Sequence, residues 1–409
     1  MSIDYLALDE ELDQEEYFVC DYTVKSDLDI ETAGKRIAEE ESTGTWTHPT
    51  TLSDEIFERY GAKVTEAEGD RVRIGYPIVD FSGEIGRIPQ ILSIIAGNLF
   101  GLDSLEGVRL VDIKVPSKLV KDYPGPQYGF KGLRKILDRP EKSLVGTIVK
   151  PKIGLPPKEF SDYVYEAGKG GLTNSKDDET LVDQDFCPLA ERVNRVSEKL
   201  DILEEEGHKM IHAHNISTNT HEILDAADLA LENGARQLMV DVLTVGFSGL
   251  QALAEDPSVK VPIHVHRAMH GAITKNPDHG IAMPVIAKLV RLAGGDALHT
   301  GTYGVGKMHA DVSEELRSKE ALLGEMHGLK KMMPVASGGL HPGLVPELME
   351  MSGKNVQIQA GGGVSGHPNG VRAGAKALSQ AVDAAFENID LREYAQEHAE
   401  LKQALEKWM

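Results

Sequence analysis

A lysine and two carboxylates stand close together in the segment KDDE, residues 176–179. Asp178 and Glu179 offer the hard oxygen ligands that a partly hydrated Mg²⁺ prefers. The ammonium of Lys176 would repel such a metal, but condensation of its nitrogen with CO2 to a carbamate would supply a third anionic oxygen. Because neighbouring carboxylates hold a lysine protonated, we expect the carbamate to need the metal to trap it. A solvated charged loop is the plainer alternative.

Two further lysines, Lys150 and Lys152, stand at i, i+2 and share one face of an extended segment. Lysines crowded together depress each other's pKa, which suits proton transfer. The alternative is a strand end that spreads its charges into solvent.

Two His-x-His pairs, His212 with His214 and His264 with His266, are candidates for metal binding. Such pairs can bind zinc, so a binuclear zinc hydrolase with a bridging carbamate is one reading. Arg267 follows the second pair, and its guanidinium suits a phosphate better than a place beside two zinc ions. Histidines satisfied within a core are the other alternative.

Two glycine-rich runs, Ser337-Gly338-Gly339 and Gly361-Gly362-Gly363, could bind phosphate. Bare backbone N–H groups can approach an anion that side chains would block. Ordinary turn glycines are the alternative.

These chemically capable residues fall at the ends of short apolar segments that alternate with helical patterns. The alternation predicts eight β-α units over about 265 residues, which is typical of a (β/α)8 barrel with its active site at the C-terminal ends of the strands. The predicted strands are 143–152, 170–179, 209–215, 236–246, 261–270, 295–304, 332–340 and 355–363.

The preceding part of the chain mixes strand and helix patterns, which predicts an α+β domain. A Pro/Gly-rich stretch at 121–132 indicates a linker, so we expect an N-terminal domain over 1–125 and a barrel domain over 126–409. The predicted strands are 15–24, 63–80 and 107–116, and the predicted helices are 30–42 and 86–102.

The amino-acid composition limits the classes of partner that the protein is expected to bind. Among 409 residues, 65 acidic side chains against 43 basic ones give a net charge of −22. Such a surface repels phosphate backbones and anionic lipid, so we expect no nucleic-acid or membrane partner. It suits a salt-rich cytoplasm, with an acidic mesophilic enzyme as the alternative. Two distant cysteines and an acidic N-terminal segment without signal-peptide order predict a cytoplasmic protein.

Several segments, in order, resemble the active-site segments of the ribulose-1,5-bisphosphate carboxylase large chain (RuBisCO). The short length and the loop GVGKM (304–308) resemble the archaeal form III type, which lacks a small subunit. The matching segments are EESTGTW (40–46), AGNLFG (96–101), GTIVKPKIG (146–154), GGLTNSKDDE (170–179), HVHRAMHGA (264–272), LHTGTYGVGKM (298–308), VASGGLHP (335–342) and QAGGGVSGHPNG (359–370).

The resemblance implies an enzyme activated by Mg²⁺ and by CO2, with the CO2 held as a carbamate on Lys176. Asp178 and Glu179 would be the other metal ligands, and the carbamate would take the C3 proton of the substrate. Lys150 would transfer protons to and from the substrate, which Lys152 would contact.

Other residues are implied to bind substrate or to act later in the reaction. His266 would be a base near the hydration step, and Lys307, on a mobile loop, would polarise CO2. The remaining substrate-binding residues in the barrel would be Arg267, His299, Ser337, Gly338, Gly339, Gln359, Gly361 and Gly362.

The resemblance also implies an assembly. In this family the positions of Glu40, Thr45, Trp46 and Asn98 come from the neighbouring subunit, with Glu40 as the ion-pair partner of Lys307. A homodimer or a higher assembly of dimers, without a small subunit, would therefore be the active form.

The implied activity is addition of CO2 and water to ribulose 1,5-bisphosphate to give two 3-phosphoglycerates, with O2 as a competing substrate and a role in salvaging the ribose of AMP. Local departures from the family are Thr173-Asn174, which bears on the tuning of the carbamate, and Met308-His309-Ala310, which bears on loop closure. The rival readings are a RuBisCO-like enolase or isomerase that does not fix CO2, the zinc hydrolase, and a non-catalytic sugar-phosphate binder.

Overall fold

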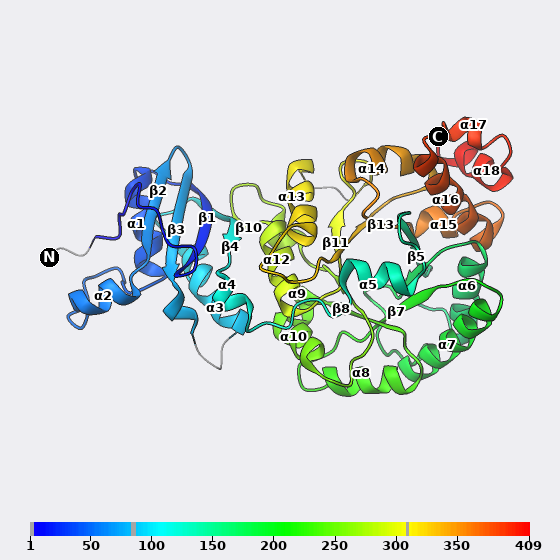
Figure 1. The fold of residues 1–409 in the computed structure, drawn as a ribbon, viewed down its shortest axis with the longest axis horizontal. Coiled ribbons are helices and arrows are strands. Elements are labelled where there is room, and N and C mark those ends of the chain that lie inside the picture. Colours follow the sequence, from blue (N-terminus) through cyan, green and yellow to red (C-terminus); the bar gives the residue numbers. More distant parts are fainter. Residues whose placement is uncertain (1–3, 83–86, 308–310) are drawn as a thin grey trace. The chain divides into compact units, whose positions relative to one another are not determined.

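The computed structural model describes residues 4–82, 87–307 and 311–409. They form two compact units, one of residues 1–123 with 269–292 and one of residues 124–268 with 293–409. Each unit is built around its own sheet (Figure 1). Among the described helices, none is long and apolar enough to cross a membrane.

The first unit contains a five-stranded sheet in the order β10-β4-β1-β3-β2. Helix α1 (Ile30–Glu40) is capped by Asp29, whose side chain accepts the Thr32 N–H, and it buries Ala33 and Ile37. The other elements are β1 (Tyr17–Lys25), α2 (Asp54–Tyr60), β2 (Lys63–Glu68), β3 (Arg71–Pro77), η1 (Ile78–Phe81), α3 (Arg87–Ile95), η2 (Leu99–Gly101), β4 (Gly107–Lys114), α4 (Ser117–Val120), α11 (Gly271–Thr274), β10 (Gly280–Ile281) and α12 (Met283–Ala293).

The second unit contains a closed barrel of eight parallel strands in the order β11-β12-β13-β5-β6-β7-β8-β9. This confirms the predicted (β/α)8 barrel preceded by an α+β part. The strands are β5 (Leu144–Ile148), β6 (Asn174–Lys176), β7 (Ile211–Asn215), β8 (Gln237–Asp241), β9 (Ile263–His266), β11 (Ala297–Gly301), β12 (Met333–Ser337) and β13 (Gln357–Gln359).

Helices surround the barrel strands, as α6, α7 and α8 show along its outer edge (Figure 1). The helices of this unit are α5 (Gly129–Ile136), α6 (Pro157–Lys169), α7 (Leu189–Glu205), α8 (Ile223–Glu232), α9 (Val242–Val245), α10 (Phe247–Glu255), α13 (Val312–Leu323), η3 (Pro342–Leu344), α14 (Val345–Ser352), α15 (Gly362–Ser365), α16 (Gly370–Glu387), α17 (Leu391–Tyr394) and α18 (Ala399–Trp408).

The strand register fixes which side chains face the barrel interior, because in-register neighbours on parallel strands point to the same side. Lys176 is in register with Ile148 and Ala213, and His264 with Met239 and Ala297. One end of the interior is filled by an apolar cluster that includes Leu133 and Leu137 around α5; its strand members are Leu144, Ile211, Ala297, Met333 and Val335. The opposite faces of the strands pack against the helices.

The observed strands are shorter than the predicted ones. The predicted strand 170–179 is only Asn174–Lys176, and the predicted strand 236–246 ends at Asp241, where α9 begins. The pattern could not mark these ends, because loop residues such as Asp177 and Asp178 are as buried as the strand itself. The loops after the strands therefore carry the candidate site.

Candidate active site

Lys176, at the C-terminal end of β6, is 1% exposed and lies beside both predicted carboxylates. Its Nζ donates to the backbone oxygen of Asp177 at 2.9 Å and lies 3.8 Å from Glu179 Oε2. Burial lowers the pKa of Lys176, although Glu179 and Asp178 act in the opposite direction. The predicted effect of the carboxylates is therefore present, but the cost of desolvating the ammonium outweighs it in the net direction of the pKa.

Lys150 and Lys152 meet the same carboxylates from the end of β5. Lys150 Nζ donates to Asp178 Oδ2 at 2.6 Å, and Lys152 Nζ lies 3.4 Å from Glu179 Oε1. The charges of Asp178 and Glu179 raise the pKa of Lys152. The expected lowering through lysine crowding is wrong for Lys152, because each ammonium faces a carboxylate rather than another ammonium. Gly361 leaves room here, since a Cβ on it would lie 3.1 Å from Lys150 Cε.

His266 ends β9 between two acidic side chains. Its Nδ1 lies 2.7 Å from Asp241 Oδ1, and its Nε2 lies 3.8 Å from Glu179 Oε2. Burial and the charge of Lys176 lower the pKa of His266, so the ring is neutral at pH 7. A neutral ring that donates Nδ1–H to Asp241 presents Nε2 as a base. Burial would raise the pKa of Glu179, but electrostatic interactions with His266 and Lys176, in their protonated forms, outweigh burial and bring the pKa to about 2.

Sequence reasoning missed Asp241, which lies in the middle of the predicted strand 236–246 but at the C-terminal end of the observed strand β8. The rule that active-site residues of a barrel lie at such ends points to Asp241 only once the end of the strand is known. Its partnership with His266 depends on β8 and β9 being neighbours in register, with Asp241 opposite His266.

His299 and Ser337 are brought together by the neighbouring strands β11 and β12. His299 Nδ1 lies 2.6 Å from Ser337 Oγ, and burial places the pKa of His299 well below its usual range. Arg267 is also buried, and burial lowers its pKa to about 10 while Glu315 and Tyr303 act to raise it. Arg267 therefore keeps its charge at neutral pH.

Lys307 connects the loop after β11 to the glycine run after β12. Its backbone N–H donates to Gly338 O at 3.0 Å, and its side chain is exposed. Gly339 has φ +78°, and a Cβ there would lie 2.5 Å from Lys307 Cγ. The run therefore needs glycine for both conformation and space. Met308-His309-Ala310 lies outside the described residues.

The glycine run after β13 follows Gln359, which is inward-facing and 1% exposed. Gly361 precedes the four-residue helix α15, which begins at Gly362. The predicted phosphate-binding residues after β12 and β13 thus lie on adjacent, paired strands.

The predicted residues of the first unit form a group of their own. Asn98 Nδ2 donates to Glu40 Oε1 at 3.0 Å, while Thr45 is half-buried and Trp46 is 85% exposed. Sequence reasoning missed Glu41, whose carboxylate accepts the N–H groups on both sides of Asn98, from Gly97 at 2.9 Å and from Leu99 at 2.6 Å. No motif separates Glu41 from Glu39 or Glu40.

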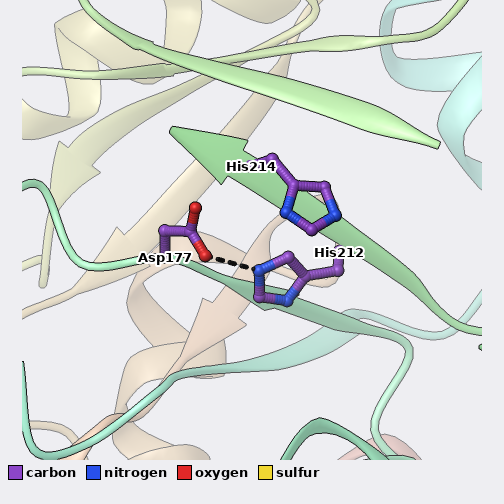
Figure 2. A group of neighbouring side chains, drawn as sticks. All are labelled: Asp177, His212 and His214. Carbon is purple, nitrogen blue, oxygen red and sulfur yellow. Dashed lines mark hydrogen bonds and ion pairs between the residues drawn. The ribbon is translucent and has the colours of Figure 1, made fainter. Parts of the chain in front are cut away.

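Asp177, His212 and His214 form a buried group of metal-ligand type behind the barrel wall (Figure 2). Asp177 Oδ1 lies 2.8 Å from His212 Nε2, and Asp177 Oδ2 accepts Arg192 at 3.1 Å and the Asn215 N–H at 2.8 Å. Both oxygens are already used, and a guanidinium would repel a cation. The group is therefore better suited to holding the loop 176–179 than to binding zinc, contrary to the His-x-His zinc reading.

Comparison with known proteins gives the same picture along the whole chain. The family profile "Ribulose bisphosphate carboxylase large chain, N-terminal domain" matches residues 4–119, and the profile for the catalytic domain matches residues 129–408. A ribulose bisphosphate carboxylase of Pyrococcus furiosus is 42% identical over 99% of this chain and 97% of its own length. One of Methanocaldococcus jannaschii is 39% identical over 99% of this chain and 100% of its own length.

Solved structures agree. The octameric ribulose-1,5-bisphosphate carboxylase/oxygenase of Pyrococcus horikoshii, crystallised with sulfate, superposes with a TM-score of 0.92 at 38% identity and covers 99% of this chain and 96% of that one. The dimeric archaeal Rubisco of Hyperthermus butylicus superposes with a TM-score of 0.89 at 35% identity and covers 99% and 98%. The chain belongs to the ribulose bisphosphate carboxylase large-chain family.

Proposed function

We propose that this chain is a ribulose-bisphosphate carboxylase, a carboxy-lyase that adds CO2 and water to ribulose 1,5-bisphosphate and releases two 3-phosphoglycerates, with O2 as a competing substrate. One observation carries the proposal: Lys176 is buried, has a lowered pKa and lies next to Asp178, Glu179 and Lys150. CO2 reacts with the neutral form of an amine, which burial favours here, and the paired carboxylates suit a divalent metal.

The residues present fit Mg²⁺ and a carbamate. Lys176 carries the nitrogen that reacts with CO2, and the resulting oxygen would join those of Asp178 and Glu179 in an all-oxygen set. Lys150 and Lys152 balance the carboxylate charge in the structure, with Nζ of Lys150 at 2.6 Å from Asp178. When bound, Mg²⁺ would polarise the substrate carbonyl, and the carbamate would supply an anionic base.

The proton-handling roles go to Lys150 and His266. Lys150 lies over Gly361 at the barrel mouth, where its ammonium can deliver a proton to the substrate. His266 presents Nε2 as a base because Asp241 holds Nδ1, which suits removal of a proton from attacking water. Lys152 would contact the substrate.

The phosphate-binding roles go to the loops after β9, β11, β12 and β13. Arg267 would bind phosphate with its buried positive charge. Lys307 has a different role, since its exposed ammonium would polarise CO2. The uncharged groups would be His299, Ser337, Gly338, Gly339, Gln359, Gly361 and Gly362.

We also propose that the active form is a homodimer or an assembly of dimers without a small subunit, in which Glu40, Thr45 and Asn98 complete a neighbour's site. The dimeric and octameric relatives support this. In this scheme residues 1–125 form the N-terminal domain and residues 126–409 the catalytic domain. The similarity to archaeal enzymes supports a cytoplasmic role in salvaging the ribose of AMP.

The test is an incubation of the purified protein with Mg²⁺, labelled bicarbonate and ribulose 1,5-bisphosphate, followed by counting of acid-stable 3-phosphoglycerate. We expect product that disappears in Lys176→Ala and persists in the control Lys158→Ala, whose side chain is 71% exposed on α6. No product, together with exchange of the C3 hydrogen of the sugar with solvent, would instead establish the RuBisCO-like enolase.

A further inference from the structure

The barrel interior contains buried polar atoms that no described residue satisfies. Five inward-facing side chains on β6, β8, β9 and β13, each 1% exposed, carry an atom without a hydrogen-bond partner among the described residues. Buried polar atoms in native proteins are almost always paired, with protein or with ordered water. These atoms are Asn174 Nδ2, Gln237 Nε2, His264 Nδ1, Gln357 Oε1 and Gln359 Oε1.

The chemistry of the five atoms selects the occupant. Two amide nitrogens are donors and two amide oxygens are acceptors, while His264 Nδ1 can be either. A cation would be repelled by the donors and an anion by the acceptors, whereas water serves both. Gly146 lies between two members of the set, since a Cβ there would stand 3.1 Å from Asn174 Cβ and 3.1 Å from Gln359 Cγ. Such short contacts would crowd even a methyl group, so glycine at this position allows the two polar side chains to lie close to each other.

One member of the set is joined to the candidate phosphate site. His264 Nε2 lies 2.8 Å from His299 Nε2, and His299 Nδ1 lies 2.6 Å from Ser337 Oγ. Both rings are buried and neutral, so each carries a single N–H. The chain of hydrogen bonds from His264 through His299 to Ser337 can therefore run in two directions.

The two directions leave Ser337 with opposite abilities. If His264 donates to His299 and His299 donates to Ser337, the Ser337 O–H is free to donate to a bound oxyanion. If Ser337 donates to His299, its lone pairs face the mouth and oppose an anion. The first direction makes His264 Nδ1 an acceptor, which then needs a donor inside the barrel.

We propose that ordered water fills this part of the barrel interior. A water molecule that donates a hydrogen bond to His264 Nδ1 then allows the Ser337 O–H to donate a hydrogen bond to a bound phosphate. His264 is then a positioning residue that acts through His299. The inference rests on the proposed function only in taking Ser337 as a contact of a phosphorylated substrate.

Neutron diffraction from deuterium-exchanged crystals of the unaltered protein, with and without inorganic phosphate, tests this directly. We expect a water at His264 Nδ1 in both crystals and, with phosphate bound, a deuteron on His299 Nδ1 and the Ser337 deuteron directed at the phosphate. A dry interior, a Ser337 deuteron still directed at His299, or phosphate that does not reach Ser337 would each overturn the proposal.

A pair of matched variants gives a second test in solution. His264→Phe should weaken inorganic phosphate binding about tenfold, the loss of one hydrogen bond to a charged group. His214→Phe is the control, because His214 is also buried with an unpartnered Nδ1 among the described residues but lies on the outward face, away from Ser337. Equal affinities of the two variants for inorganic phosphate would refute the proposed chain of hydrogen bonds.

These tests separate the two proposals. Phosphate binding and deuteron positions do not require turnover, so an enzyme that makes no 3-phosphoglycerate can still show the water and the oriented chain. Conversely, active protein with a dry barrel interior would overturn only the inference about water.

Discussion

The pair of Asp177 and Arg192 behind the metal loop provides a direct test of how the site is held. Both side chains are fully buried, and Asp177 also binds His212 and the Asn215 N–H. Removing one partner of a buried ion pair costs about 3–5 kcal/mol, because the other charge stays desolvated. In Asp177→Asn one oxygen still accepts a hydrogen bond worth about 1 kcal/mol. We therefore expect a loss of about 2–4 kcal/mol in the free energy of unfolding.

The assay is urea unfolding at pH 7, with stability compared through midpoints at constant slope. Asp383→Asn is the control, since it makes the same substitution in the partly exposed pair with Lys142 and should cost at most about 1 kcal/mol. Equal losses in the two variants would refute the reasoning. Loss of a stoichiometric zinc ion from Asp177→Asn would also refute it, because Asp177, His212 and His214 would then be a metal site.

The pKa of Asp177 predicts how the stabilisation by this ion pair changes with pH. Burial would raise the pKa of Asp177, but Arg192 and His212 outweigh it and hold the pKa well below its usual range. The stabilisation is therefore complete above the unfolded pKa of about 3.9 and is lost as the pH falls below it. The difference between wild type and Asp177→Asn should be largest near pH 7 and should shrink at pH 3; a difference that grows on acidification would contradict the assignment.

Three further predictions concern other parts of the chain. Glu41→Gln should lower kcat while leaving CO2 capture by Lys176 intact. The two carboxylate oxygens of Glu41 accept the N–H groups of Gly97 and Leu99, whereas an amide has only one oxygen. An unchanged kcat would exclude a role of Glu41 in positioning this segment. Trp408→Ala should raise the KM for the bisphosphate, with partial rescue in Trp408→Phe. The Trp408 ring stacks on the ring of His341, which follows the glycine run after β12, with the two ring centroids 5.7 Å apart. An unchanged KM would contradict this prediction. The net charge of −22 predicts carboxylation that persists or rises in molar KCl, and a steady loss of rate on adding KCl would refute that.

The barrel could be predicted because its strands and helices leave local signals. Each buried strand is a short apolar run, and its C-terminal end is marked by polar residues such as Lys176 and His266. Met332 and Met333, at the start of one such run, are both fully buried. These features depend only on residues close in sequence.

What could not be predicted depends on residues distant in sequence. The pKa of Lys176 is set by how deeply the barrel buries it, and that of Lys152 by the carboxylates of the next strand. The partnership of His266 with Asp241 follows from the register of β8 and β9. The polar interior near Gln357 emerges only when inward-facing positions from several strands are brought together.

The central claim, that Lys176 captures CO2 beside a Mg²⁺ ion, can be tested at residue level. The protein is equilibrated with ¹³C-bicarbonate and Mg²⁺, any carbamate is alkylated to a stable urethane, and the peptides are analysed by mass spectrometry. We predict a labelled urethane on Lys176 that requires both CO2 and Mg²⁺ and is lost in Asp178→Asn. Absence of label from Lys176, or label that is independent of Asp178 and of the metal, would contradict it.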